Sequence, residues 1–350
     1  MADLAPEAAP NRSGGDAREG PGADGGALHG LYGPASEAWR LNREATILLG
    51  AGPRALLLQL AHPLVAEGVD QHSAFREDPW RRLEATLRSY LRIVYGSAPA
   101  ARAELRRLAA LHRRVQGPVR DPVARDVTGV ERYEAGDPAL SLWVHATLVD
   151  STMVAADAWL QRLDPQRRAA FYAETRPIGR AFGIGEADLP ADLGAFQAYL
   201  DRMLGPGGPV TVTPTARELA RTILHPPLGP LVRDPRVSAG GLAAAGPLLD
   251  RLPPATYDWL LWPALDLLPP RIREAYGIPW TPARRLISAW LTRSWSAGRL
   301  AFPPRLRWMP QALAAHARMA AARGDAGRPS SDAPAVASHP AVASHPAVAS

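Results

Sequence analysis

The most constraining feature of this 350-residue chain is the helical spacing of its apolar residues, which recur every three or four positions along nearly the whole length. The alternation typical of half-buried strands is confined to the brief run of residues 210–213. Hydrophobic residues make up 47% of the sequence, enough for a chain of this length to bury a sizeable core. The sequence therefore predicts an all-α fold, built as a single multi-helix domain.

Glycine, proline and capping residues mark the expected helix boundaries. Gly50 and Pro53 predict a break between the first two helices, Asp78 predicts an N-cap, and Gly96 and Gly117 predict helix ends. The segment at 139–160 is apolar around most of its circumference, as expected of a central buried helix. The expected helices span residues 34–49, 54–61, 80–95, 101–116, 139–160, 166–182, 192–204, 215–224, 240–252, 255–267, 269–276 and 282–298.

Composition divides the chain into one folded body with two disordered ends. Residues 1–28 are mostly Ala, Gly, Pro and charged residues, and residues 323–350 carry the short-period AVASHP repeats. The folded domain is expected at 29–322. The N-terminal segment has no apolar core of a secretory signal, and no window offers the roughly 18 uninterrupted apolar residues of a transmembrane segment. We therefore expect a soluble, cytoplasmic protein.

The sequence contains no cysteine, and all 40 of its basic residues are arginine. Disulfides, thiolate ligands, iron–sulfur clusters and cysteine nucleophiles are thereby excluded, and so are lysine Schiff bases and a P-loop lysine. The arginines are scattered through amphipathic helices beside Glu and Asp rather than gathered with aromatic residues, so we do not expect a nucleic-acid partner.

His112 is the most informative single residue. It lies in the expected helix 101–116 on the stripe that carries Leu105, Leu108 and Val115, which points it toward an apolar interior. A histidine on such a face is more often a satisfied core residue than a ligand. His145, in the most apolar helix, is a second histidine of this kind.

Two common metal-site patterns are absent: the HExxH zinc signature, and the paired Glu-x-x-His motifs of di-iron bundles. A haem needs only one axial histidine and an apolar slot, because the porphyrin supplies the other four ligands. Covalent attachment through cysteine is impossible here, so such a haem would be b-type.

Arg82 and Thr86 are four residues apart and share one edge of the expected helix 80–95. Two interpretations stay open from this spacing. In the first, Arg82 is a surface residue or an ion-pair partner of Asp78. In the second, Arg82 and Thr86 face a pocket and donate hydrogen bonds to a bound oxygen species or to a haem propionate.

An ordered series of short motifs resembles the MpaB and rubber oxygenase (latex-clearing protein) catalytic-domain family over roughly residues 30–300. Each motif is weak alone, and their order is fairly specific. The series comprises Ala61-His62-Pro63, Phe75, Arg82-Leu83, Thr86, Val94-Tyr95-Gly96, His112 with Val115 and Gly117, Tyr133 with Ala135 and Asp137-Pro138, and Trp143-Val144-His145-Ala146-Thr147 with Asp150-Ser151.

The resemblance implies an all-α fold resembling a globin and, in latex-clearing members, a haem b dioxygenase that cleaves polyisoprene double bonds. By this resemblance His112 matches the proximal ligand of the haem iron, with His145 as the fallback. Arg82 and Thr86 match residues of the distal pocket, and Glu67 lies roughly where those members place a catalytic base.

Three departures narrow the expected activity. Ala85 occupies the place of a lysine that can close the distal iron position in a rubber oxygenase, so this pocket cannot be gated in that way. The export signal of rubber-degrading members is missing. Fungal members act on the prenyl chains of small metabolites, a substrate class that suits an intracellular enzyme better than a polymer.

The leading hypothesis is thus a haem-b-dependent oxygenase that uses dioxygen on an apolar, isoprenoid-like alkene. One alternative is a non-catalytic helical carrier of haem or of an apolar small molecule, in which the histidines serve packing. Another is a non-haem metal oxidoreductase that uses His62, His72, His112 and His145.

Overall fold

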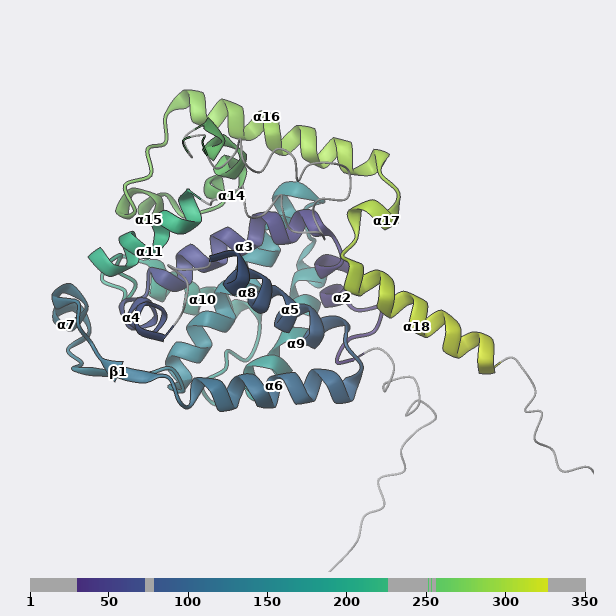
Figure 1. Cartoon of the computed structure of the whole chain (residues 1–350), viewed down its shortest axis with the longest axis horizontal. Coiled ribbons are helices and arrows are strands. Elements are labelled where there is room, and N and C mark those ends of the chain that lie inside the picture. Colours follow the sequence, from purple (N-terminus) through teal and green to yellow (C-terminus); the bar gives the residue numbers. More distant parts are fainter. Residues whose placement is uncertain (1–29, 73–78, 226–250, 252, 254–255, 327–350) are drawn as a thin grey trace, which may run out of the picture.

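A long apolar helix, α8 (Pro138–Trp159), runs through the middle of the molecule (Figure 1). The computed structural model describes residues 30–72, 79–225, 251, 253 and 256–326. Asp137 caps α8 by accepting a hydrogen bond from the backbone N–H of Ala139 at 2.8 Å, and Pro138 opens its first turn. Its side chains are buried on nearly every side because helices surround it, as its composition predicts.

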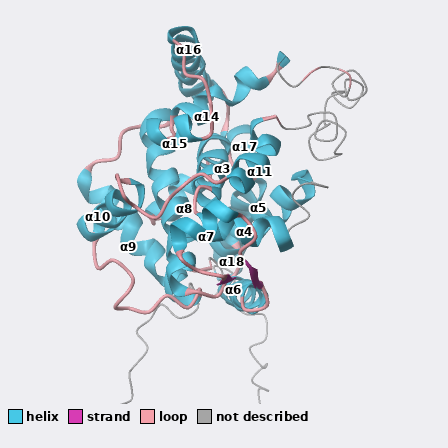
Figure 2. Cartoon of the chain, turned by 90° about the vertical axis from the view of Figure 1, so that its left-hand side faces the viewer, coloured by secondary structure: helices cyan, strands magenta, loops and turns pink. Residues whose placement is uncertain are grey.

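Helices make up the great majority of the described structure, so the predicted all-α class is confirmed (Figure 2). Before α8 the chain forms α2 (Glu37–Asn42), α3 (Ala45–Leu60), α4 (Pro63–His72), α5 (Pro79–Tyr95), α6 (Ala98–His112) and α7 (Pro122–Thr128). After α8 come α9 (Pro165–Ala181), α10 (Leu193–Leu204), α11 (Pro214–Leu224), α14 (Trp262–Asp266), α15 (Pro270–Ala275), α16 (Pro282–Gly298), α17 (Pro304–Arg307) and α18 (Pro310–Ala326), with 3₁₀ turns η3 (Asp258–Leu261) and η4 (Arg299–Ala301).

The predicted break at Gly50 and Pro53 is wrong, because α3 continues through both residues. Gly50 instead allows close packing: a methyl group there would lie 2.7 Å from ring atoms of Trp159 on α8. The apolar face of α3 is buried against α8, and this burial outweighs the local preference of glycine and proline for a helix end. The expected helix at 34–49 is correspondingly divided near Arg43 into α2 and the start of α3.

The helix expected at 101–116 ends at His112 rather than at residue 116. The next residues form strand β1 (Gln116–Pro118), which pairs antiparallel with β2 (Arg132–Glu134), Gly117 opposite Tyr133. Pairing with a segment about fifteen residues away therefore ends α6 early. Val115 consequently leaves the stripe of α6 and packs with the small cluster around Tyr133.

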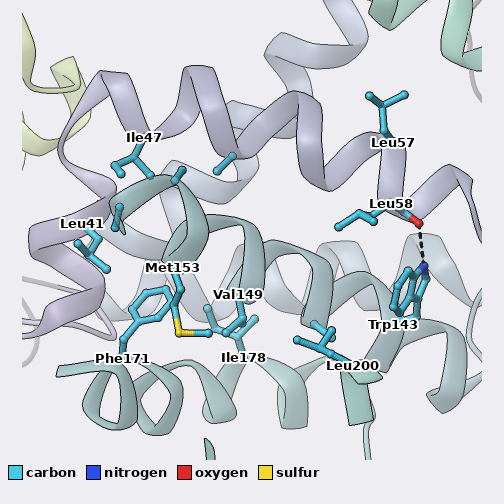
Figure 3. Close-up of a cluster of buried hydrophobic side chains, with 14 of the residues drawn as sticks. Leu41, Ile47, Leu57, Leu58, Trp143, Val149, Met153, Phe171, Ile178 and Leu200 are labelled. Atoms are coloured by element: carbon cyan, nitrogen blue, oxygen red, sulfur yellow. Dashed lines mark hydrogen bonds between the residues drawn. The ribbon is translucent and has the colours of Figure 1, made fainter. Parts of the chain in front are cut away.

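The main core lies between α3, α8 and α9, where Ile47, Leu58, Val149 and Phe171 are buried (Figure 3). Trp143 of α8 is fully buried, and its indole N–H donates to the backbone oxygen of Leu58 at 3.1 Å. This bond satisfies the one polar atom of a large apolar side chain, so burying the ring incurs no penalty for a lost hydrogen bond.

A buried arginine ties three helices together around this core. The Arg54 guanidinium on α3 contacts the Asp150 carboxylate at 2.7 Å, and donates to the Ser151 hydroxyl and the Leu267 backbone oxygen, each at 2.7 Å. Asp150 and Ser151 lie on α8, and Leu267 directly follows α14. The Asp150-Ser151 motif therefore helps to hold the fold.

Several expected features fall outside the described residues: the N-cap at Asp78, Phe75, most of the helix at 240–252, and nearly all of the two predicted disordered ends. At the C-terminal end α18 extends to Ala326, slightly beyond the expected domain limit at 322. The helix expected at 255–267 is divided into η3 and α14.

Among the described helices, α8 alone is long and apolar enough to cross a membrane by length and composition. In its most apolar window 67% of the residues are buried inside the protein, which is typical of the core helix of a helical bundle.

Candidate functional site

Arg82 and Thr86 form a mutually bonded pair on one edge of α5. The Arg82 guanidinium donates to the Thr86 hydroxyl oxygen, and the hydroxyl in turn donates to the Arg82 backbone oxygen at 2.9 Å. The two bonds fix the direction of the guanidinium, which would otherwise move on a long flexible side chain.

This pair lies toward the open end of α5. Along the apolar stripe of α5, Val94 is fully buried, Tyr90 and Leu87 are half-buried, and Leu83 is exposed. Arg82 is exposed as well, and partial desolvation of its guanidinium lowers its pKa.

The sequence predicted that His112 points into the apolar interior, but the structure leaves it half-buried as the last residue of α6. Its imidazole lies beside the ring of Phe182, just beyond α9, with 5.8 Å between ring centroids. Burial and the nearby charge of Arg82 both lower the pKa of His112. The imidazole is therefore neutral at neutral pH, the form in which a ring nitrogen can bind a metal.

The effect of the Arg82 charge on the pKa of His112 indicates that α5 and α6 bring these two predicted site residues near each other. Arg82 acts on His112 through its charge, and the two helices pack along one another. Because Arg82 and Thr86 are both exposed, the structure leaves both interpretations of Arg82 open. The predicted ion pair of Arg82 with Asp78 falls on a residue outside the described part of the chain.

His145 and His62 are two further buried histidines. His145 lies on α8, 3.5 Å from the position that a methyl group at Gly179 of α9 would take, and burial lowers its pKa to about 4. His62 lies near Trp143, and burial lowers its pKa to about 4 as well. Each has one ring nitrogen without a hydrogen-bond partner among the described residues: Nε2 of His145 and Nδ1 of His62.

The histidines do not combine into one metal site. Across the described ranges, no group of three or more histidine and carboxylate side chains is placed to hold a metal ion. His72 is exposed and its ring contacts the backbone oxygen of Gln116 at 3.1 Å. The geometry therefore does not favour the four-histidine non-haem site, whereas a single axial histidine needs no such cluster.

Glu67 makes contacts of a different kind. It is buried on α4, and its carboxylate accepts hydrogen bonds from the backbone N–H groups of Asp121 at 2.8 Å and Arg120 at 3.1 Å, and from the Gln71 amide at 2.6 Å. Its hydrogen bonds within the described structure thus hold the segment that leads into α7. A role as catalytic base remains a prediction from the resemblance, and these contacts favour a structural role.

The donor set at α5 and α6 fits one axial ligand for a haem. His112 supplies a neutral imidazole that is half-buried and partly accessible, beside the aromatic ring of Phe182. Arg82 supplies a fixed cation, the usual partner of a carboxylate such as a propionate. His145 also has a lowered pKa, but it is buried.

A separate hollow of about 440 Å³ lies beside β2 and the start of α8. Leu64, Tyr133, Asp137 and Leu140 are among the residues that line it. None of the predicted site residues belongs to this hollow, so we do not assign the site to it.

The sequence profile of the family described as ER-bound oxygenase mpaB/B'/rubber oxygenase, catalytic domain, matches residues 39–298. The match covers most of the chain and includes every candidate site residue, so the chain belongs to this family. No curated protein and no solved structure matches the chain. The family is one of oxygenases, which makes the chain a member of an oxidoreductase class.

Sequence reasoning missed two residues that shape this region. Phe182 contacts His112 from a segment seventy residues further along the chain, a pairing that no local pattern signals. Gly179 of α9 lies beside His145, a contact that no local pattern signals either.

Proposed function

We propose that this protein is a haem-b-dependent oxygenase that uses dioxygen on an apolar alkene of the isoprenoid class, such as the prenyl chain of a small metabolite. The observation that carries the proposal is the neutral, half-buried imidazole of His112 beside the fixed cation of Arg82. Membership of an oxygenase family supports it.

In this proposal His112 would hold the haem iron through a ring nitrogen that burial and the Arg82 charge leave unprotonated. The haem, when bound, supplies the iron chemistry that lets dioxygen react with an alkene. Arg82 provides positive charge for an anionic group, and Thr86 holds the guanidinium in one orientation. Ala85, between them on α5, leaves this edge without a lysine ammonium.

The visible spectrum of haem-reconstituted protein tests the axial ligand. We expect a Soret band whose position changes in His112→Ala, and haem occupancy by the pyridine haemochrome assay that falls at least tenfold. His72→Ala is the matched control, because His72 is exposed and its ring contacts the Gln116 backbone oxygen and the Tyr133 ring. Full occupancy in His112→Ala together with its loss in His145→Ala would move the ligand to His145.

Oxygen consumption with isoprenoid alkenes tests the enzymatic activity. An oxygenase consumes oxygen in proportion to alkene lost, whereas a carrier of haem or of an apolar molecule binds its ligand without consumption. Binding without oxygen uptake would contradict the proposal and favour the carrier. We further propose a cytoplasmic location, which fractionation of the native cells would test.

A further inference from the structure

Helix α16 presents two unlike faces. Ser288 and Leu291 are buried, 0% and 4% exposed, and lie on the side that packs on α14 and α8. Leu286 and Trp290, one turn apart on the opposite side, are 70% and 64% exposed. The helix lies along the top edge of the molecule in Figure 1, so its apolar outer face has no described helix above it.

Further exposed apolar residues follow α16 along the chain. Six of the fourteen large hydrophobic residues exposed in the described structure lie within this stretch: Leu286, Ile287, Trp290, Leu300, Phe302 and Leu306. We call these six residues the α16–α17 surface. Scattered exposed leucines need no explanation, but such a concentration indicates a contact with something apolar.

Along the sequence, this stretch carries charge of one sign, and the acidic residue that contacts α16 in the described structure is Asp266 of α14. Between Glu274 and Asp325 the sequence has no acidic residue at all. Arg285 and Arg293 on α16 and Arg305 on α17 are exposed. Exposed leucine, tryptophan and phenylalanine together with arginine and no acidic residue are the composition of a helix that lies in the interface of an anionic membrane.

We propose that the α16–α17 surface docks on the anionic face of a lipid bilayer. The apolar side chains enter the boundary between headgroups and acyl chains, while the arginines contact lipid phosphates. Charge complementarity favours this occupant over a second copy of the chain. A symmetric dimer through the same surface would bring Arg293 and Arg305 toward like charges, without any acidic residue in the stretch 275–324 to offset them.

Docking would place the enzyme at the phase in which an apolar alkene is most concentrated. This consequence rests on the proposed function, but the docking itself does not. Vesicle binding is measured without haem turnover or alkene, so failure of docking and failure of the oxygenase proposal are distinguishable.

Flotation of the full-length protein with vesicles tests the proposal. We expect the protein to float with phosphatidylcholine vesicles that contain phosphatidylglycerol, to float poorly with phosphatidylcholine alone, and to be released by salt. Leu286→Ser/Trp290→Ser should weaken binding at least about tenfold, because two exposed apolar side chains no longer enter the bilayer. Val127→Ser, an exposed apolar residue on α7, is the matched control.

The charge contribution has its own pair of variants. Arg293→Gln/Arg305→Gln should weaken binding to anionic vesicles about 25-fold, since each arginine near an anionic surface contributes about fivefold. Arg106→Gln, exposed on α6, should leave binding unchanged. All substituted side chains are exposed, so circular dichroism and the melting temperature should not move.

Three results would overturn the proposal. The wild-type protein could fail to float with anionic vesicles. The Leu286→Ser/Trp290→Ser variant could bind as well as wild type. Light scattering could show a dimer that this variant dissociates, without any vesicle binding, in which case the surface is an interface between copies.

Discussion

The contact between Arg54 and Asp150 gives the sharpest prediction for the fold. The side chains are 5% and 16% exposed, and they join α3 to α8. In Asp150→Ala the guanidinium loses its counter-charge but stays buried, because its bonds to Ser151 and to the Leu267 backbone oxygen remain. We therefore expect Asp150→Ala to destabilise the protein far more than the loss of a surface ion pair.

The magnitude follows from the geometry. Charges 2.7 Å apart attract by about 6 kcal/mol at an effective dielectric constant of about 20. Desolvation of both groups offsets much of this attraction, and breaking a buried pair costs about 3–5 kcal/mol. Because Asp150 retains some solvent contact and Arg54 keeps two other acceptors, we expect a loss of about 3 kcal/mol in the free energy of unfolding.

Urea unfolding followed by circular dichroism, at one fixed state of haem loading, measures this loss. Glu84→Ala is the control, because the Arg88–Glu84 pair is largely exposed and should contribute only about 0.3–0.5 kcal/mol. A double-mutant cycle with Arg54→Met should show a coupling energy of at least about 1 kcal/mol. If Asp150→Ala costs no more than Glu84→Ala, the reasoning about burial is refuted.

Three further predictions concern packing and protonation. Gly50→Ala should destabilise the protein by about 1–3 kcal/mol, because the new methyl group would lie 2.7 Å from Trp159. Gly52→Ala, with open space around it, should be neutral or stabilising. Equal shifts of the melting temperature in the two variants would contradict this reasoning. In haem-free protein Arg82→Met should raise the pKa of His112 in an NMR titration, and an unchanged pKa would refute the interaction. Because burial lowers the pKa of His62 and His145 to about 4, the unfolded chain binds more protons below about pH 6.5. Each histidine should then cost on the order of 3 kcal/mol of stability as the pH falls from about 6.5 to about 4, and His145→Asn should flatten that slope in urea midpoints.

The helices most accurately predicted are those whose ends carry local signals. Thr281 caps α16 through its hydroxyl and Pro282 opens its first turn, and the predicted span of 282–298 agrees with the structure. The break at Gly50 was wrong because the deciding contact, with Trp159, comes from more than a hundred residues away. The β1 and β2 strands were missed because three-residue segments carry no periodicity.

The site was predictable to the extent that it lies on single helices. The four-residue spacing placed Arg82 and Thr86 together, and the structure shows them bonded. The surroundings of His112 and Glu67 were not predictable, because Phe182 and the Arg120–Asp121 backbone reach them from distant segments. The half-buried state of His112 follows from the early end of α6, which depends on the pairing of β1 with β2.

Burial has opposite consequences at the two candidate histidine ligands. At His112 the desolvation is partial, so the imidazole is kept neutral while one side remains accessible. At His145 desolvation is complete, and Nε2 has no hydrogen-bond partner among the described residues. This unpaired buried nitrogen lowers the stability of the fold unless a ligand binds it. If His145 were the ligand, haem removal would leave Nε2 of His145 without its partner, and hydrogen exchange should increase in α8 and α9. If His112 is the ligand, hydrogen exchange after haem removal should increase mainly at the ends of α5 and α6, while α8 stays protected.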